Sequence, residues 1–300
     1  MYRIGIIGSE NSHAMAFAKI FNGLDPNCET EYPDMRVVAV AGHYPEESQK
    51  VYETCGLDFI ADDPKDMLGK VDAIMVTARN GQFHPEFARP FIEAGIPAFI
   101  DKPFANDAEE ALSLVRLAKK KGVPLVGGSS TKYVYDVQLL RNAVKFENRT
   151  GMGNLGGIHG GAVSAPLNMN NEYGGFYFYS SHLAEISMTI FGYDPLSVSA
   201  FRCGDDVTAV VNYDRYNVTN HFMEGCYSYN AAVYAKNKTL FRDIDIGMCY
   251  QHECASFTNM LRHGIQDHSY EELILPVYYL NAIERAYQTG VTQAIPKVEV

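Results

Sequence analysis

Apolar runs alternate with helical patterns through the first 127 residues, and this alternation constrains the fold more than any other feature of the sequence. The apolar runs lie at residues 3–8, 35–42, 72–78, 97–101 and 123–128. Short apolar strands that alternate with helices are typical of βαβ units, in which helices cover both faces of a parallel sheet. We therefore predict an α/β fold with a doubly wound parallel sheet over residues 1–127.

The pattern changes after residue 127. Residues 195–243 contain short β-branched and aromatic runs at roughly ten-residue intervals, joined by Gly, Asp and Asn turns, which indicates an antiparallel sheet. Helices are expected at residues 136–146, 180–192, 250–264 and 270–289. A chain of 300 residues exceeds what one core usually organises. Residues 128–300 are therefore predicted to form a second, α+β domain with a mainly antiparallel open sheet.

Composition and charge exclude several classes of partner. The net charge of −11 argues against nucleic acid, which requires a basic face. The sequence has no apolar run of about 18 residues and no features of a signal peptide, so we expect no membrane span and a cytoplasmic location. The cysteines show no disulfide framework, and Cys249, His252 and Cys254 lack a fourth ligand at a supporting spacing. Free thiols and no metal site are therefore expected.

The first strand leads into the stretch "GIIGSENSHAMAF" at residues 5–17, which begins like a dinucleotide-binding turn. Gly8 takes the first position of the fingerprint G-x-G-x-x-G, but Glu10 and His13 stand where the other two glycines are expected. Gly8 lies where a strand ends and a helix begins, and the backbone N–H groups at such a place attract anions.

Glu10 has two interpretations that the sequence leaves open. A carboxylate near a helix N-terminus is favourable by about 0.3–1 kcal/mol, yet it would repel a bound pyrophosphate unless it turned toward solvent. The neighbouring Ser9, Asn11 and Ser12 are good N-cap residues, and their polar atoms could also contact phosphate oxygens. This stretch alone does not decide whether a nucleotide binds.

The end of the second strand does not decide between NAD and NADP. An acidic residue there would bind the ribose hydroxyls of NAD, but the sequence has Gly42 and His43. The missing acid leaves room for a 2′-phosphate, for which His43 is a modest cationic partner.

Two further stretches carry candidate catalytic groups. Lys102 in "FIDKPFA" follows a strand of the parallel sheet, at the carboxyl edge where such sheets bind ligands, and the next proline keeps it extended. His182 and Glu185 are three residues apart on a predicted helix and so share a face, which suits a general base beside a carboxylate. Each residue also has an interpretation without a catalytic role. Lys102 could be a surface lysine, and His182 could be a capping or packed histidine.

Taken in order, these segments resemble the glucose–fructose oxidoreductase/inositol dehydrogenase/MocA family over nearly the whole chain. The segment at residues 71–105 resembles the family's stretch that ends in E-K-P, here Asp101-Lys102-Pro103. The segment at residues 174–192 resembles its glycine-rich stretch leading to H-x-x-D, here His182 and Glu185. The chain departs from the family pattern at Phe178, where the family usually has an aspartate four residues before the histidine.

The resemblance implies an N-terminal Rossmann domain and an NAD(P)-dependent oxidoreductase that acts on a sugar, polyol or related hydroxy compound. His182 matches the family's acid/base, Lys102 matches a lysine that helps to fix substrate and nicotinamide, and Glu185 would orient substrate hydroxyls or the imidazole. A homodimer or homotetramer built on the open sheet is also implied. The cofactor contacts are expected from Gly8, Ser9, Asn11, Ser12, His13, His43, Thr77, Ala78, Arg79, His84, Asp101, Lys102 and Pro103.

Two other interpretations stay open beside this one. The chain could be a degenerate member that binds a sugar-like ligand or a partner without redox turnover. It could also be a non-redox enzyme, such as a lyase or an NAD-recycling hydrolase. The direction in which Glu10 points distinguishes them, because a carboxylate that fills the anion site weakens the dehydrogenase interpretation.

Overall fold

The computed structural model describes residues 1–151 and 153–300. It divides into two compact units. The first comprises residues 1–128, 250–274 and 300, and the second comprises residues 129–249 and 275–299. The long helix α8 (Tyr270–Thr289) begins in the first unit and continues into the second.

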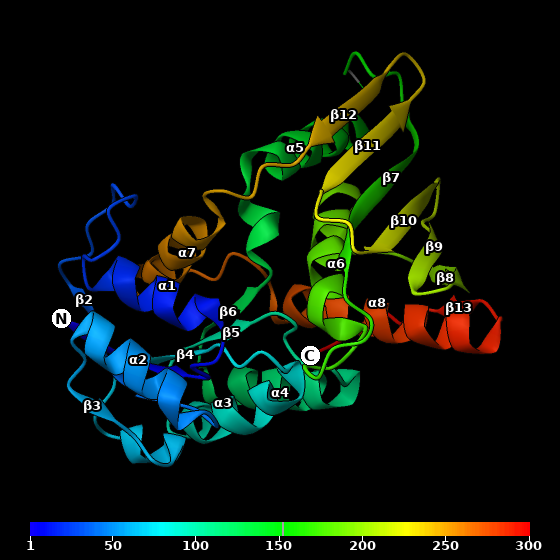
Figure 1. Cartoon of the computed structure of the whole chain (residues 1–300). Helices are drawn as coiled ribbons and strands as arrows, with labels where there is room; N and C mark the ends of the chain where they lie inside the picture. The colour runs from blue at the N-terminus through cyan, green and yellow to red at the C-terminus, as the bar shows by residue number, and fades with distance from the viewer. Residues whose placement is uncertain (152) are drawn as a thin grey trace. The chain divides into compact units, whose positions relative to one another are not determined.

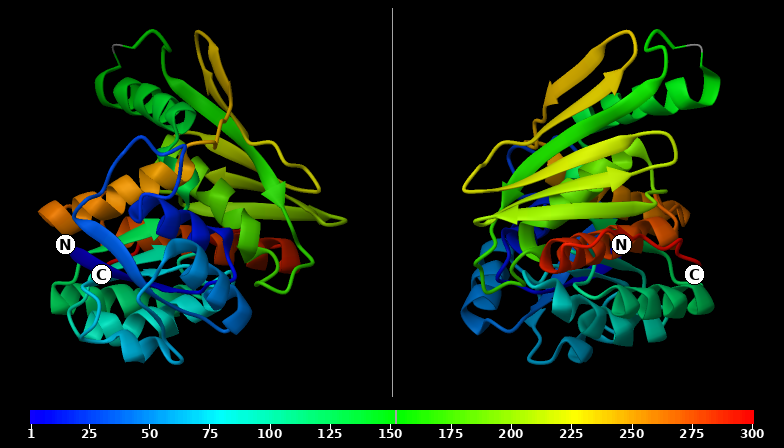
Figure 2. Two further views of the ribbon diagram at one scale, coloured as in Figure 1. Left: turned by 60° about the vertical axis from the view of Figure 1, so that its left-hand side comes forward. Right: turned by 90° about the vertical axis from the view of Figure 1, so that its right-hand side faces the viewer.

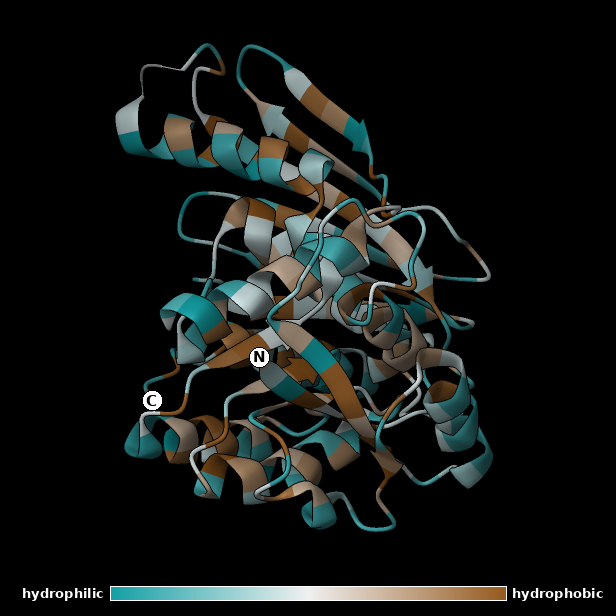
Figure 3. Ribbon diagram, turned by 90° about the vertical axis from the view of Figure 1, so that its left-hand side faces the viewer, coloured by the Kyte–Doolittle hydropathy of each residue, from teal (hydrophilic) through white to brown (hydrophobic). Residues whose placement is uncertain are grey.

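The first unit contains a six-stranded parallel sheet with the strand order β3-β2-β1-β4-β5-β6 (Figure 1). Its central strands are buried along their length, because helices cover both faces, and Figure 3 shows them in the brown of hydrophobic residues. The strands are β1 (Tyr2–Ile7), β2 (Met35–Ala41), β3 (Phe59–Ile60), β4 (Ala73–Val76), β5 (Ala98–Asp101) and β6 (Leu125–Gly128). The doubly wound parallel sheet predicted from the sequence is confirmed.

The helices of this unit begin and end where local signals predict. In α4 (Ala108–Lys121), the side chain of Asp107 caps the first turn, and lysines at the last turn complement the helix dipole. Gly122 ends the helix in the left-handed conformation, at φ +66°. The other helical segments are α1 (Ser12–Phe21), α2 (Pro45–Cys55), η1 (Pro64–Met67), η2 (Gly81–Phe83), α3 (His84–Glu93) and α7 (Cys249–His263).

Helix α7 returns to the first unit although it lies more than a hundred residues further along the chain. Its side chains Cys254, Phe257 and Met260 are buried in the same core cluster as Phe17 of α1 and Phe99 of β5. A continuous second domain over residues 128–300 does not describe this arrangement. The apolar face of α7 is buried against segments that are distant in the sequence. Local sequence patterns do not reveal such contacts.

The second unit contains a seven-stranded sheet with the order β12-β11-β7-β10-β9-β8-β13. Only the central pair β7 and β10 is parallel, so the prediction of a mainly antiparallel sheet is confirmed. The right-hand view of Figure 2 shows its long strands side by side. The strands are β7 (Ile158–Leu167), β8 (Ser197–Cys203), β9 (Asp206–Asn212), β10 (Asn217–Glu224), β11 (Asn230–Ala235), β12 (Thr239–Asp243) and β13 (Gln293–Ala294).

One face of this sheet packs against helices. Along β10, Val218, Asn220 and Phe222 are buried while the residues between them are partly exposed, which is the alternation of a half-buried strand. The covering elements include α6 (Tyr177–Phe191), with α5 (Tyr135–Thr150) beside it. A short 3₁₀ segment, η3 (Ser130–Tyr133), precedes α5. Helix α6 begins three residues earlier than predicted, so its first turn holds the aromatic residues of "FYFY".

No helix in residues 1–151 and 153–300 combines the length and the apolar character needed to cross a bilayer. All six cysteines are free.

Candidate nucleotide and acid/base sites

Gly8 lies in a tight turn at the carboxyl end of the parallel sheet, where its backbone packs against that of Thr77 and Ala78; we call this turn the Gly8 cradle. Gly8 has a φ of +102°, and a Cβ atom built on it would lie 2.1 Å from the backbone nitrogen of Ala78. The hydroxyl of Thr77 donates a 2.7 Å hydrogen bond to the Gly8 carbonyl, which holds β1 against the end of β4. Only glycine fits here, because both the backbone conformation and the close approach exclude a side chain.

The residues after Gly8 hold the turn in place. Asn11 caps α1, since its side-chain oxygen accepts from the backbone N–H of His13. The Ser9 hydroxyl lies 2.8 Å from the hydroxyl of Ser48 on α2. Ser12 is exposed in the first turn of α1. The helix N-terminus therefore lies at the sheet edge, where dinucleotides bind in folds of this type.

Glu10 reaches across the turn to the loop after β4. Its Oε1 atom accepts a 2.9 Å hydrogen bond from the backbone N–H of Arg79. Its Oε2 atom is buried and has no hydrogen-bond partner among residues 1–151 and 153–300. The carboxylate thus points into the turn between β1 and β4, rather than toward solvent.

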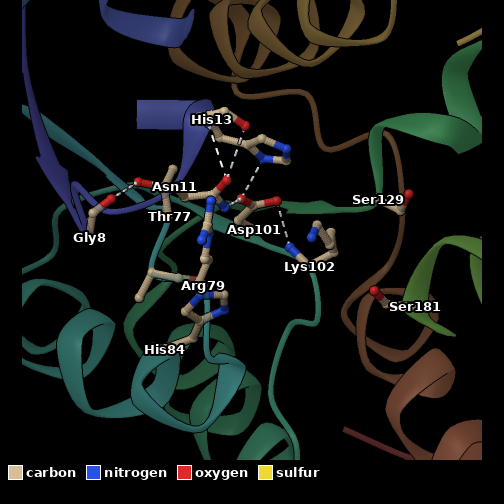
Figure 4. A network of polar contacts seen from close by, with 12 residues as sticks. Gly8, Asn11, His13, Thr77, Arg79, His84, Asp101, Lys102, Ser129 and Ser181 are labelled. Carbon is tan, nitrogen blue, oxygen red and sulfur yellow. Dashed lines mark hydrogen bonds and ion pairs between the residues drawn. The ribbon is translucent and has the colours of Figure 1, made fainter. Parts of the chain in front are cut away.

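His13, at the third glycine position, belongs to a buried polar network (Figure 4). Its Nδ1 atom lies 2.6 Å from Oδ2 of Asp101, to which the Asn11 amide also donates at 3.3 Å. The imidazole packs edge-on against Tyr250 of α7. Burial alone would raise the pKa of Asp101, but His13 and the charges of Lys102 and His84 outweigh burial and hold that pKa below its usual range. His13 therefore joins α1 to the end of β5.

Lys102 follows Asp101 directly, and its backbone N–H donates a 2.7 Å hydrogen bond to Oδ1 of Asp101. Its side chain is only 4% exposed. Burial lowers the pKa of Lys102, against the opposing influence of Asp101 and of Glu253 on α7. An ammonium group desolvated in this way interacts strongly with a developing negative charge.

Three other expected cofactor residues line the loop edges. His84 is fully buried, and its ring Nε2 lies 2.7 Å from the Ala78 carbonyl, which it helps to orient. Burial lowers the pKa of His84. Pro103 is buried against Gly81, and His43 packs against the rings of Phe83 and Phe87. The observed contact of His84 is therefore with another residue of the protein, Ala78, whose loop it orients.

In the second unit, His182 lies in the second turn of α6 and is buried. Its Nδ1 atom lies 2.7 Å from the hydroxyl oxygen of Ser129. That oxygen lies 2.7 Å from the hydroxyl of Thr131, which lies 3.4 Å from the backbone carbonyl of His182. The rings of Tyr179 and Tyr229 lie about the imidazole at 5.9 and 6.1 Å between centroids.

Glu185 is one turn further along α6 and forms a buried ion pair. Its Oε2 atom lies 3.1 Å from Nζ of Lys132, and its Oε1 atom accepts from the backbone N–H of Ser129 at 3.1 Å. Both partners are at most 4% exposed. Burial raises the pKa of Glu185, and Lys132 and the Ser129 N–H oppose that rise. These contacts of the carboxylate thus go to η3 and its cap, whereas the sequence suggested a substrate or imidazole contact.

Sequence reasoning missed Ser129, Thr131 and Lys132. A signal was present, because four polar residues, 129–132, directly follow the last strand of the parallel sheet. Polar residues at that place read as an exposed loop, yet all four are at most 2% exposed. Their burial depends on partners in α6, about fifty residues away, which no local pattern reveals.

The backbone of the turn at Gly8 has the features of a dinucleotide site, but the side chain of Glu10 does not suit one. The glycine cradle, the capped N-terminus of α1 and the sheet edge are the features that hold a pyrophosphate. The Glu10 carboxylate, with its buried and unbonded Oε2, lies in the same turn and would have to move for a pyrophosphate to enter. No acidic side chain stands at the end of β2.

Comparison with known proteins accords with this geometry. Residues 2–129 match the profile of an oxidoreductase family with an NAD-binding Rossmann fold, the glucose–fructose oxidoreductase/inositol dehydrogenase/MocA family. The match covers less than half of the chain, and it places residues 2–129 beside the members of this family. The resemblance drawn from the sequence motifs is confirmed, and the first unit is a Rossmann domain of the NAD-binding type.

Curated relatives match only part of the chain. D-glucoside 3-dehydrogenase of Escherichia coli K12 is 32% identical over 113 residues, which cover 37% of this chain and 32% of that protein. Inositol 2-dehydrogenase of Corynebacterium glutamicum strain R is 41% identical over 54 residues, or 18% of this chain and 16% of that protein. The matches therefore span about a third of the relatives' length or less.

Solved structures match the fold over almost the whole chain. A putative myo-inositol dehydrogenase from Sinorhizobium meliloti 1021 superposes with a TM-score of 0.80, at 16% identity, over 99% of this chain and 100% of that one. The scyllo-inositol dehydrogenase of Lactobacillus casei, solved with NAD(H) and scyllo-inositol, gives a TM-score of 0.82 at 13% identity, over 98% and 99% of the two chains. The second unit therefore shares the fold of these proteins as well.

Proposed function

We propose that the chain is an NAD-dependent dehydrogenase that oxidises a secondary hydroxyl group of a polyol or sugar. The observation that carries the proposal is Lys102, a buried lysine held by Asp101 at the carboxyl edge of an NAD-binding type of domain. The names of the relatives, which act on inositols and a glucoside, support this class of substrate.

The Rossmann unit would hold the cofactor through the Gly8 cradle and the N-terminus of α1. The nicotinamide of bound NAD supplies the hydride acceptor. The Lys102 ammonium would stabilise the alkoxide that develops as a hydroxyl group loses its proton.

The second unit would supply the base. Removal of hydride from a carbinol carbon requires removal of the hydroxyl proton, and the imidazole of His182 would accept it. Glu185 is proposed to act through its contacts with Ser129 and Lys132, which fix the segment that faces the imidazole. This assignment replaces a direct contact of Glu185 with substrate.

The test of the proposal is a titration of the purified chain with NAD⁺, NADH, NADP⁺ and NADPH, followed by nicotinamide fluorescence and by thermal unfolding. Binding of NAD(H) should raise the unfolding temperature as its concentration exceeds Kd. A panel of inositols and D-glucosides then tests turnover by the absorbance of NADH. Absence of binding by every nucleotide at about millimolar concentration, where even an affinity of about −4 kcal/mol is detected, would overturn the proposal.

We also propose that the chain forms a homodimer or homotetramer through the second unit. Phe201 on β8 and Phe241 on β12 expose 65% and 52% of their surface, and exposed apolar side chains on a sheet favour association. Sedimentation velocity tests this, and a monomer at micromolar concentration would contradict it.

The free cysteines suit the reducing environment of the cytoplasm, which we propose as the location.

A further inference from the structure

A chain of hydroxyl groups ends on the imidazole of His182. Ser129 caps η3, and its side-chain oxygen accepts from the backbone N–H of Thr131 at 3.2 Å. The same oxygen lies 2.7 Å from the Thr131 hydroxyl and 2.7 Å from Nδ1 of His182. Ser129 and Thr131 are at most 1% exposed and His182 is 8% exposed, so these hydrogen bonds are shielded from water.

The direction of each hydrogen bond follows from the number of protons available. A carbonyl oxygen only accepts, so the Thr131 hydroxyl donates its one proton to the backbone carbonyl of His182. The Thr131 oxygen then accepts from the Ser129 hydroxyl, whose one proton is used in turn. With all of these hydrogen bonds formed together, the Ser129 oxygen accepts from the imidazole, which places a proton on Nδ1.

We propose that Ser129 and Thr131 are positioning residues that hold His182 in the tautomer protonated on Nδ1, so that Nε2 is the basic nitrogen. The Ser129 oxygen uses both of its lone pairs in this arrangement, one for Nδ1–H and one for the Thr131 N–H. Glu185 supports this tautomer indirectly, because its carboxylate accepts from the backbone N–H of Ser129 and so fixes the position of Ser129.

This arrangement suits an acid/base group for a physical reason. When Nε2 takes up a proton, Nδ1 keeps its own, so the hydrogen bond to Ser129 persists in both charge states of the ring. Nothing in the hydroxyl chain has to reorient during proton transfer. The assignment of His182 as base rests on the proposed function, whereas the tautomer is a property of the protein alone.

The test is a long-range ¹H–¹⁵N NMR measurement of the histidine rings in the full chain, without cofactor or substrate. The signals of His182 are assigned by their loss in His182→Gln among the nine histidines. At a pH where the ring is neutral, we expect Nδ1 to show the shift of a protonated nitrogen and Nε2 that of an unprotonated one. A protonated Nε2 beside an unprotonated Nδ1 would overturn the proposal.

Three variants test the cause of the tautomer. Thr131→Val keeps the shape but removes the hydroxyl, which frees the Ser129 proton to donate to Nδ1, so the proton on the ring should move to Nε2. Thr131→Ser keeps the hydroxyl and should keep Nδ1 protonated. Ser129→Ala removes the acceptor and should also shift the ring toward protonation on Nε2.

An unchanged tautomer in both Thr131→Val and Ser129→Ala would show that the hydroxyl chain does not set it. Should either variant fail to fold, the wild-type tautomer and the other variant still decide. If the chain turns over a polyol, Ser129→Ala should also lower kcat by about 10- to 100-fold, which is less than the full 10²- to 10⁴-fold contribution of a general base, without a change in the Kd for NAD. A missing activity would count against the proposed function alone, because the tautomer is measured independently.

Discussion

The carboxylate of Glu10 accepts a hydrogen bond from the backbone N–H of Arg79 at 2.9 Å, and so joins the β1–α1 turn to the loop after β4. In a Rossmann domain this is the region where the pyrophosphate of the cofactor lies. The side chain therefore provides a negative charge, from within the protein, at the place where the cofactor would bring its own. The family match of residues 2–129 supports NAD binding, and we expect the Glu10 carboxylate to weaken that binding.

Replacement of Glu10 should strengthen NAD binding. Glu10→Gln removes the repelling charge, and Glu10→Gly also permits close approach of the backbone. We expect a decrease in Kd of about tenfold, or about 1.4 kcal/mol, for Glu10→Gln and a larger one for Glu10→Gly. Isothermal calorimetry or nicotinamide fluorescence measures it. Added salt should narrow the difference between wild type and Glu10→Gln, because it screens the repulsion.

The control for this change is Glu93→Gln, an exposed carboxylate at the far end of α3 that alters the net charge equally. It should leave the Kd nearly unchanged. An equal gain from both variants would mean that net charge matters and that the position of Glu10 does not.

The cradle at Gly8 should tolerate no side chain. Gly8→Ala places a Cβ 2.1 Å from the backbone nitrogen of Ala78, at a φ of +102°, so we expect a loss of about 3 kcal/mol or more in the free energy of unfolding. Gly122→Ala is the matched control, because its φ is +66° and no atom lies within 4 Å of its Cβ position. It should cost about 1 kcal/mol. Equal losses, measured by urea unfolding, would contradict the close approach.

The fold was predictable where local signals and tertiary packing agree. The apolar strands of the first unit, the Asp107 cap and the Gly122 stop of α4 can all be read from neighbouring residues. The return of α7 to the first unit could not, because Phe257 meets its partners Phe21 and Phe99 only after folding.

The candidate sites show the same division. Gly8, Lys102 and His182 follow from motifs, since chemistry requires those residue types at strand ends and helix faces. The contact of Glu10 with Arg79 joins two loops, and the contact of Ser129 with His182 joins residues 53 positions apart. Such side-chain partners depend on distances that only the folded chain sets.

Asp101 should contribute to stability in a pH-dependent way. Its pKa in the folded protein lies below the usual value, so the unfolded chain binds a proton more readily. The contribution is therefore complete above the unfolded pKa of about 3.9 and is lost as the pH falls through the lower, folded pKa. Asp101→Asn should cost about 3 kcal/mol at neutral pH, because it leaves His13 and the Lys102 N–H without a carboxylate, and should flatten the acid limb of the stability curve.

Urea unfolding between about pH 3 and 7, a range that spans the carboxyl pKa, measures both effects. Asp72→Asn is the control, because its carboxylate also has a lowered pKa but pairs with Arg3 at the surface. Its effect at neutral pH should be much smaller. A similar loss from both variants would show that the buried network adds nothing beyond a surface ion pair.

The buried pair of Lys132 and Glu185 should stabilise the second unit only as a pair. Lys132→Met leaves the Glu185 carboxylate buried without its cation, at a cost of about 3–5 kcal/mol. The double variant Lys132→Met/Glu185→Leu should recover most of that loss, since an apolar pair of similar volume can replace a buried ion pair. A double-mutant cycle of unfolding free energies measures the coupling. Additive losses would mean that the two side chains do not interact.

His182 should be required for turnover and not for cofactor binding. His182→Gln removes the imidazole that accepts the hydroxyl proton, so kcat for a polyol substrate should fall by about 10²- to 10⁴-fold while the Kd for NAD stays the same. The two effects separate because the Gly8 cradle and the His182 imidazole belong to different units of the chain. His159→Gln, an exposed histidine on β7 of the same unit, is the control and should leave kcat unchanged. NADH absorbance under saturating substrate measures turnover, and a variant with wild-type kcat would remove His182 from the chemistry.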